Sequence, residues 1–506
     1  MKRILSLFSL VLVTMFLAAC GGKTQSPANT KNVVTTTKDQ YTNLVSSVTG
    51  VEYEACTLTY AAWDLGQEDA EVPNMDRLML RAFEAAYPGI KVKVLERPKY
   101  PGTNDDQNWD EFLTARASVG MLPDVFQPDD IPLGIKNGWC YDLTELAKAD
   151  EEYNKMSKDI TDAATYDGHV MALPQSIFYW GFLVNKTLYE SKNLDAPTTD
   201  TTYEELMTLT KSAANHTSTV GNGVVGLTGI EHIIHWYASQ LNINYGWWTY
   251  DGEKFNLDSD EFAEAVSEYR KLRTDSTFVL EALQDLAMAE DSTIVLEDIF
   301  GSTDYTNDEK LLCKFIASYE FGAYQSKLDR SELQDDYAFI GTPVINGNKR
   351  VPVILDFLCV SSTTEHPNEA FLLAKWMGYG DDGYTERLIL GEQFKDQNIE
   401  LVNYPSMTGN EEHLDAYFET FWAFEDLRDI IDNGTFIVEP PKFLPGYNAA
   451  RYSGAYDVET NMYSEMVRIM DGDVNLADVK AELNRRANEL MAADATLVKE
   501  AIAKLK

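Results

Sequence analysis

Apolar residues recur along this chain with two different periods. Between residues 74 and 86 they return every three or four positions, which predicts an amphipathic helix. A Pro-Gly pair at 88–89 ends that pattern, and residues 90–96 alternate apolar and charged as a strand does. Before the helix, an apolar stretch from Cys56 runs into Trp63 and reads as another strand. Strand, helix and strand in this order predict a βαβ unit in a parallel sheet.

The same alternation continues further along the chain. A helical pattern at 109–120 precedes a short strand that opens into an acidic loop at 122–130. Thr201 and Thr202 stand before two glutamates with the spacing of a capping box, which predicts a helix start there. Further helices are expected near 259–275 and 366–377, and through most of the last 90 residues. The pattern as a whole predicts an α/β protein.

The first residues have the layout of a secretory signal. Lys2 and Arg3 form a basic start, an apolar run follows, and two alanines precede Cys20. The run is shorter than the ~20 apolar residues of a membrane span. A cysteine after small residues resembles the bacterial lipobox, which implies a signal peptide at 1–19 and a lipid on Cys20; a plain signal peptide is the alternative.

The composition narrows the classes of partner. With 506 residues, the chain is long enough for at least two domains. Its net charge of −39 speaks against nucleic acid and against binding to anionic lipid surfaces through basic clusters. Residues 20–52 are rich in Gly, Ser, Thr, Asn and Lys, which is typical of a flexible tether.

Catalytic and metal-binding motifs are weak. The four cysteines after the tether show no C-x-x-C spacing, so buried thiols and disulfides both remain open: Cys56, Cys140, Cys313 and Cys359. His232 and His235 lie on one helical face without an evident third ligand. The acidic stretch at 103–111 lacks the spacing of an EF-hand, and a solvated loop is the favoured interpretation over a calcium site. We therefore predict no catalytic residues, no metal and no cofactor.

Six sequence blocks carry a family resemblance. They occur in order at 75–96, 122–146, 166–214, 249–272, 337–377 and 467–491. Together they resemble the extracellular solute-binding proteins of bacterial ABC importers, in the branch of maltose-binding protein and other sugar binders. The resemblance extends over about residues 56 to 493. Two stretches depart from it: 354–360 lacks a Gly-Gly pair, and the block at 314–324 is degraded.

The resemblance implies a two-lobed fold of the type II periplasmic-binding-protein kind. Each lobe would be a mostly parallel sheet flanked by helices, and crossing hinge strands would join the lobes. The expected N-terminal lobe comprises 56–174 plus 356–412, and the expected C-terminal lobe comprises 177–354 plus 413–506. The resemblance also implies a monomeric, lipid-anchored extracytoplasmic receptor that is not an enzyme. It would hand a sugar to the permease subunits of an ABC transporter.

Three adjacent aromatic residues occupy the expected first crossing. Neighbouring side chains on a strand point to opposite faces, so Phe178, Tyr179 and Trp180 cannot all enter one core. Sugars present apolar C–H faces and a rim of hydroxyls, which aromatic plates, carboxylates and amides can bind. We expect one or two of the three to line the cleft; packing of all three is the alternative.

Further candidate ligand residues lie at expected strand ends and in the second lobe. Trp63 and Asp64 end the first strand, and Gln127, Asp129 and Asp130 end another, on the usual ligand side of an α/β sheet. Structural packing of Trp63 and a solvated loop or helix start at Asp129 and Asp130 remain alternatives. Trp236, Trp247 and Trp248 could stack on a sugar or pack in the core. Asp356 and Phe357 fall at the second crossing.

Two other functions remain open. A receptor for a peptide, a polyamine or another cationic solute on the same fold would use acidic residues to pair charge. A secreted polysaccharide-degrading enzyme would need two carboxylates at a set separation, which 81 acidic residues neither support nor exclude.

Overall fold

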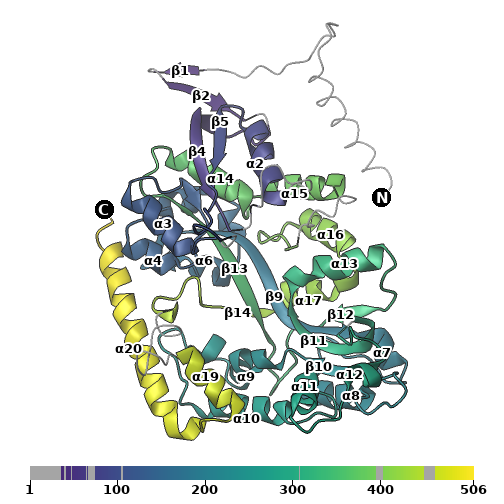
Figure 1. Cartoon of the computed structure of the whole chain (residues 1–506). Coiled ribbons are helices and arrows are strands. Elements are labelled where there is room, and N and C mark those ends of the chain that lie inside the picture. The colour runs from purple at the N-terminus through teal and green to yellow at the C-terminus, as the bar shows by residue number, and fades with distance from the viewer. Residues whose placement is uncertain are drawn as a thin grey trace, which may run out of the picture.

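One mixed sheet runs through the molecule and connects two lobes (Figure 1). The computed structural model describes residues 36–38, 41–46, 48–63, 65, 74–103, 106–306, 308–394, 403–448 and 462–505. The sheet follows the order β10-β11-β9-β13-β6-β4-β5, with β12 beside β9 and β14 beside β13. The predicted signal peptide, Cys20 and most of the predicted tether lie outside the described residues.

The first lobe is built on three parallel strands. Its elements are β4 (Cys56–Ala61), α2 (Met75–Ala86), β5 (Ile90–Val94), α3 (Trp109–Ser118), β6 (Val125–Phe126), α4 (Ile131–Lys136), α5 (Thr144–Ala149), α6 (Lys158–Asp162), α14 (Pro367–Met377) and α15 (Asp381–Phe394). Strand β4 pairs in parallel with β5 and β6, so the predicted βαβ unit is confirmed. Helix α2 begins at Asn74, whose side chain caps two backbone N–H groups, and its apolar stripe faces the core.

The second lobe repeats this construction at the other end of the sheet. Its elements are α7 (Lys186–Glu190), α8 (Tyr203–Ala213), β10 (Val225–Thr228), α9 (Ile233–Leu241), α10 (Asp260–Arg273), α11 (Leu280–Met288), α12 (Leu296–Phe300), β11 (Leu311–Ala317), α13 (Phe321–Asp329) and β12 (Tyr337–Phe339). Strands β10 and β11 are parallel. The predicted capping box is present, because Thr202 and Glu205 satisfy each other's backbone N–H groups at the start of α8.

Two long strands cross between the lobes. Strand β9 (Leu173–Asn185) pairs with β13 along its first half and with β11 and β12 along its second half. Strand β13 (Arg350–Val360) runs back antiparallel to β9 and reaches β6. Figure 1 shows both strands passing through the middle of the molecule. The α/β, two-lobed fold with crossing strands expected from the resemblance is the fold observed.

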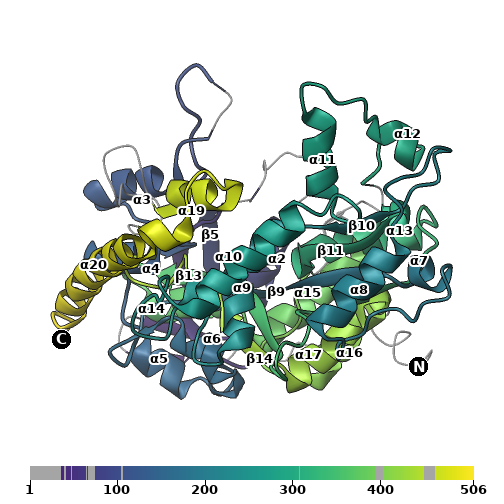
Figure 2. The same cartoon turned by 90° about the horizontal axis from the view of Figure 1, so that it is seen from below.

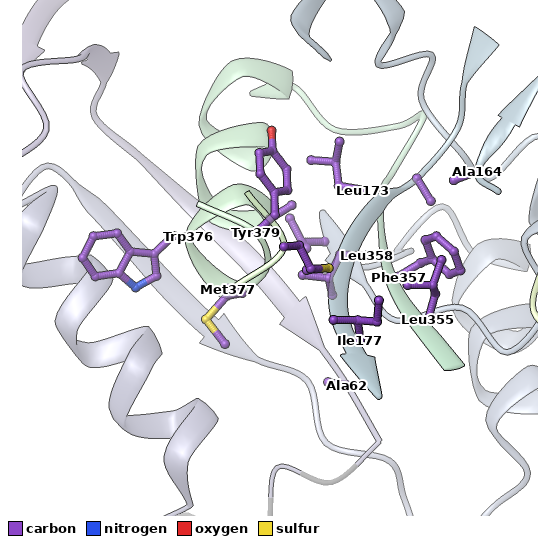
Figure 3. Close-up of a cluster of buried hydrophobic side chains, with 14 of the residues drawn as sticks. Ala62, Ala164, Leu173, Ile177, Leu355, Phe357, Leu358, Trp376, Met377 and Tyr379 are labelled. Carbon is purple, nitrogen blue, oxygen red and sulfur yellow. The ribbon is translucent and has the colours of Figure 1, made fainter. Parts of the chain in front are cut away.

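The inner side of the crossing is apolar. Ile177 of β9 pairs with Leu355 of β13, and both belong to one buried cluster with Phe357 and with Met377 of α14 (Figure 3). Phe357 retains only 1% of its exposed surface. Because alternate residues of a strand face opposite sides, the residues of β9 and β13 that alternate with these apolar ones face the opposite side of the sheet.

The C-terminal quarter is mostly helical, as predicted, and it does not stay in one lobe. It comprises α16 (Glu411–Thr420), α17 (Asp426–Asn433), β14 (Thr435–Val438), α19 (Met462–Asp471) and α20 (Leu476–Ile502). The first part of α20 packs with the second lobe's core through Leu483 and Met491, whereas Val498 and Ile502 join the first lobe's core. Seen from below, α20 lies along the first lobe beside α4 (Figure 2).

A small antiparallel sheet precedes the first lobe. It consists of β1 (Thr36–Lys38), β2 (Tyr41–Val45) and β3 (Glu52–Glu54). Ser46 donates a hydrogen bond to the carbonyl of Ala86 at 2.9 Å, and the ring of Tyr53 meets that of Tyr87 edge-on. Part of the segment predicted as a tether is therefore paired in strands against α2 (Figure 1). Within the described residues, no helix is both long and apolar enough to cross a membrane.

Candidate ligand site between the lobes

The carboxyl ends of β4 and β6 place Trp63 and Gln127 together. These parallel strands end at the same edge of the sheet. The backbone N–H of Trp63 donates to the Gln127 side-chain oxygen at 3.0 Å. The amide nitrogen of Gln127 donates to Gln175 of β9 at 2.6 Å, so the buried amide is held from both sides. Trp63 and Gln127, two of the predicted site residues, are thus in contact at the predicted edge of the sheet. Asp64, which was predicted together with Trp63, lies outside the described residues.

Gln175 sits at an irregularity in the crossing strands. The pairing of β9 with β13 shifts register between Asp356 and Phe357, which leaves Gln175 without a cross-strand partner. A bulge of this kind bends a strand and redirects a side chain. Here it directs Gln175 to Gln127, and beyond it Ser176, Phe178 and Trp180 share one face of β9.

Asp356 carries the charge at the second crossing. It accepts a hydrogen bond from the Ser176 hydroxyl at 2.8 Å and forms an ion pair with Lys442. The Lys442 ammonium also lies 5.0 Å from the centre of the Trp63 ring, within the range of a cation–π contact. Lys442, from the segment after β14, therefore joins the predicted Asp356 to the predicted Trp63.

The two aspartates after β6 have different environments. Asp130 is the N-cap of α4: its carboxylate accepts from the Leu133 N–H at 2.9 Å and from Asn448 at 3.2 Å. Burial, followed by the charge of Asp110, raises the pKa of Asp129 to about 6, although Lys442 and Arg97 oppose the shift. Asp130 thus has the helix-start role that was the alternative, and Asp129 is the partly buried acid facing the site.

The aromatic triplet of β9 divides between two faces, as the strand geometry predicted. Tyr179 is buried and meets the Phe436 ring edge-on at 5.7 Å. Phe178 and Trp180 lie on the opposite face, where both meet Tyr319 edge-on, at 5.7 and 6.3 Å. Tyr319 follows the carboxyl end of β11 and is largely exposed. Phe178, Trp180 and Tyr319 thus form an aromatic corner beside the strand end.

A row of rings continues from Trp180 into the second lobe. Trp180 stacks on Phe315 with centroids 5.6 Å apart, and its ring lies 4.6 Å from that of His232. His235 follows at 5.7 Å from His232 and contacts both Trp247 and Trp248 at 4.7 Å. Burial lowers the pKa of His232 to about 4, so this imidazole is neutral at physiological pH.

The other predicted tryptophans of this lobe are packed beneath the row. Trp236 has 1% of its surface exposed and stacks on Phe315 at 5.9 Å. Trp247 and Trp248 are buried in the same cluster, and Trp248 adopts a positive φ of 55°. These three tryptophans therefore pack beneath the row of rings. Within the row, Trp180, His232 and His235 keep part of their surface exposed.

Glu281 adds a carboxylate that the sequence analysis missed. It accepts from the Thr228 hydroxyl at 2.8 Å and from the Gly229 N–H at 2.7 Å, so it lies at the carboxyl end of β10. Its second oxygen has no hydrogen-bond partner among the described residues. Burial raises its pKa above the usual range. Gln175, Tyr319 and Lys442 were missed as well, because only the folded pairing of distant segments brings them to the site.

The strand ends of both lobes therefore meet on one part of β9. Ser176 marks the polar end, beside Asp356, and Trp180 marks the aromatic end, beside Ala317 of β11. Ser176 and Trp180 are four positions apart on β9, which corresponds to about 13 Å at roughly 3.3 Å per residue. This arrangement offers hydrogen-bonding groups from one lobe and ring faces from the other.

Metal binding finds no support in the described part of the chain. No group of three or more His, Cys, Asp or Glu there could hold a metal ion. In the acidic stretch at 103–111, Asp106 pairs with Lys99 at 2.7 Å, and residues 104–105 lie outside the described residues. A separate cavity of about 650 Å³ lies against α17, lined by carboxylates and by Trp422, and it contains none of the predicted site residues.

Comparison with known proteins identifies the family. The model of the bacterial extracellular solute-binding protein family matches residues 67–378. The chain belongs to this family. Its extracytoplasmic location follows from that membership. No curated protein sequence matches the chain.

Solved structures share the fold at low sequence identity. A sugar transporter protein from Rhizobium etli, in an open conformation, superposes with a TM-score of 0.61 at 15% identity, covering 86% of this chain and 99% of that one. An ABC substrate-binding protein from Listeria monocytogenes in complex with cycloalternan gives 0.58 at 18% identity, with the same coverage. A cyclic α-maltosyl-1,6-maltose binding protein from Arthrobacter globiformis superposes with a TM-score of 0.53 at 16% identity, covering 87% of this chain and 99% of that one.

Proposed function

We propose that this solute-binding protein captures a neutral sugar or oligosaccharide between its lobes and delivers it to an ABC transporter, without altering it. The observation that carries the proposal is the meeting of polar and aromatic groups on one face of β9, from Ser176 to Trp180. A sugar ring needs both, because its C–H faces stack on aromatic rings while its hydroxyls exchange hydrogen bonds. Three structural relatives support the same class, because one is in complex with cycloalternan, one is a cyclic α-maltosyl-1,6-maltose binding protein and one is a sugar transporter protein.

Unpartnered ring nitrogens support a ligand rich in hydroxyls. The indole N–H of Trp63 in one lobe and that of Trp180 at the crossing have no acceptor among the described residues. The Nδ1 atom of His232 is also without a partner there. Buried polar groups of this kind normally have partners. Sugar hydroxyls both donate and accept hydrogen bonds, so one saccharide could satisfy all three after the side chains adjust.

The charges of the site favour a neutral ligand over a cation. Asp356 is already paired with Lys442, and burial makes protonation of Asp129 easier than in water. The charge of Asp356 is therefore already offset, whereas Asp129, with a pKa of about 6, is still mostly ionised at neutral pH and interacts with the charges of Lys442 and Arg97. The chain's overall acidity still makes a cationic solute the second class to test.

A thermal-shift screen tests the proposed ligand class. The full chain would be heated with mono- and oligosaccharides, spermidine and short peptides. A binding ligand stabilises the folded state by RT ln(1 + [L]/Kd), so a saccharide series should raise Tm by several degrees. Chromatography of the recovered saccharide should show it unchanged. New reducing ends would indicate an enzyme, and a shift with spermidine or peptide alone would exclude the carbohydrate assignment.

The lobe boundaries and the anchor belong to the same proposal. The crossings at β9 and β13 support lobes of 56–174 plus 356–412 and of 177–354 plus 413–506, with the end of α20 docking back on the first lobe. We infer a monomer anchored by lipid at Cys20 and docking on permease subunits. Cys20→Ala should move the protein from the membrane fraction to the medium or periplasm; retention at the membrane would contradict the lipid anchor.

A further inference from the structure

Two of the four cysteines that follow the tether lie side by side in the first lobe. The sulfur atoms of Cys140 and Cys359 are 3.6 Å apart, and both residues are buried. Cys359 is in β13, three residues after Asp356, and Cys140 is in the loop between α4 and α5. Cys56 and Cys313 lie elsewhere: Cys313 is in β11 of the second lobe, and Cys56 begins β4.

The backbone fixes this pair from both sides. Tyr141 donates its N–H to the carbonyl of Val360 at 2.8 Å, and Ser362 donates to the carbonyl of Trp139 at 2.7 Å. These bonds set Cys140 opposite Ser361 in an antiparallel bridge, so that Cys359 is its diagonal neighbour on the same face. Gly134 leaves the room that the pair occupies, because a Cβ there would lie 2.8 Å from the Cys140 sulfur.

We propose that Cys140 and Cys359 form a disulfide in the exported protein. The sulfur atoms need to approach by about 1.5 Å to reach the bonding distance of about 2.05 Å. The extracytoplasmic location of the family supplies an environment in which disulfides persist. The bond would join positions 219 residues apart and fasten the α4–α5 loop to β13, the strand that carries Asp356 of the ligand site.

The oxidant is a disulfide donor, either a small-molecule disulfide or a thiol–disulfide oxidoreductase. One cysteine, as thiolate, attacks a sulfur of the donor, forming a mixed disulfide and releasing one donor thiolate. The second cysteine thiolate then attacks the protein sulfur of that mixed disulfide and releases the other donor thiolate. The two protons lost by the protein thiols are taken up by the two donor thiolates. The protein pair is oxidised by two electrons, and the donor is reduced by two.

Folding should control when this reaction occurs. Burial raises the pKa of the Cys359 thiol well above its usual range, so the folded protein holds almost no thiolate there. Oxidised glutathione should therefore cross-link the pair readily during refolding and slowly once the reduced protein has folded.

The decisive experiment is peptide mass spectrometry of the full exported chain, purified without reductant, unfolded and alkylated. The proposal predicts a cross-linked peptide that contains Cys140 and Cys359, with Cys56 and Cys313 alkylated. Reductant should lower the Tm of the wild type and of the control Cys313→Ala by several degrees. It should leave the Tm of the Cys140→Ala/Cys359→Ala variant unchanged.

Alkylation of Cys140 and Cys359 in the unreduced wild type would overturn the proposal. This outcome needs no variant, so it holds even if the double substitution fails to fold. A cross-link of Cys140 to Cys56 or Cys313 would overturn it equally, since the fold brings the sulfur of Cys359 to within 3.6 Å of that of Cys140.

Discussion

The face of the strand on which a side chain lies decides whether it packs in the core or is available to a ligand. The aromatic run of β9 shows this directly, because Tyr179 packs inward while Trp180 on the other face keeps exposed surface. Trp180 lies between the polar end of the site and the histidine row of the second lobe. It is therefore the residue whose loss should affect ligand binding most selectively.

Trp180→Ala should weaken saccharide binding about tenfold or more while the protein remains folded. Stacking on an aromatic face contributes on the order of 1 kcal/mol beyond the apolar area buried, and 1.4 kcal/mol is a factor of ten in Kd. Trp422→Ala is the matched control, because that exposed tryptophan lies beside the separate cavity against α17. Calorimetric titration of both variants would measure the difference; an equal effect of the two would contradict the assignment of Trp180.

Asp129 should make stability depend on pH in a specific direction. Burial raises its pKa from 3.8 to about 6, so the folded state binds the proton more tightly than the unfolded state does. The contribution of Asp129 to the free energy of unfolding is therefore fully present below pH 3.8 and is lost as pH rises through about 6.

Asp129→Asn should remove this dependence. The free energy of unfolding of the variant, minus that of the wild type, should increase between pH 4 and pH 7. Urea denaturation at a series of pH values would measure it. A difference that is flat or falls with pH would show that Asp129 is ionised in the folded protein like an exposed carboxylate.

The residues that sequence reasoning missed share one physical cause. Trp63, Gln127 and the β9 triplet could be found because strand ends and alternation are local patterns. Lys442 could not, because its contact with Asp356 joins positions 86 residues apart. The roles of Trp247 and Trp248 could not be decided either, since the positive φ at Trp248 and the packing around His235 are properties of the folded lobe.

The crossing strands were predictable as elements, whereas their close packing was not. Helix α2, strand β5 and the capping box of α8 follow from local sequence alone. At the crossing, the Gly341 backbone passes so near β9 that a Cβ on Gly181 would lie 2.4 Å from the Gly341 Cα. Gly341 itself has a φ of 64° and accepts a hydrogen bond from Phe182 at 2.9 Å.

Gly181→Ala should destabilise the protein by about 1–3 kcal/mol, the usual cost of overpacking a close contact. The neighbour is backbone, so it cannot move aside as a flexible side chain would. Gly322→Ala in α13 is the control, because a Cβ there meets nothing within 4 Å and alanine favours a helix. Urea midpoints of the two variants test this; a wild-type midpoint for Gly181→Ala would show that the approach of Gly341 is looser than described.

At the scale of the whole molecule, one sheet and one helix connect the lobes. Strands β9 and β13 carry the sheet across, and α20 contributes to both hydrophobic cores. The order of helices and strands predicted the α/β class, and the family resemblance implied two lobes joined by crossing strands. The order of elements could not show that β13 pairs antiparallel with β6, or that the last turns of α20 return to the first lobe, because such pairings depend on contacts across hundreds of residues.

Two lobes that share strands can close on a ligand by bending the strands between them. The polar groups around Asp356 and the rings around Trp180 would then approach the same saccharide from opposite sides. One neutral saccharide should therefore bind per chain at this crossing.

Isothermal titration calorimetry of the full chain with the saccharide that raises Tm measures this stoichiometry. We expect one site per chain, a negative heat-capacity change from the rings that are covered, and a Kd that hardly changes between low and high salt. Trp180→Ala should raise the Kd in the same titration. The absence of saccharide binding, together with strongly salt-dependent binding of spermidine or a peptide, would contradict it.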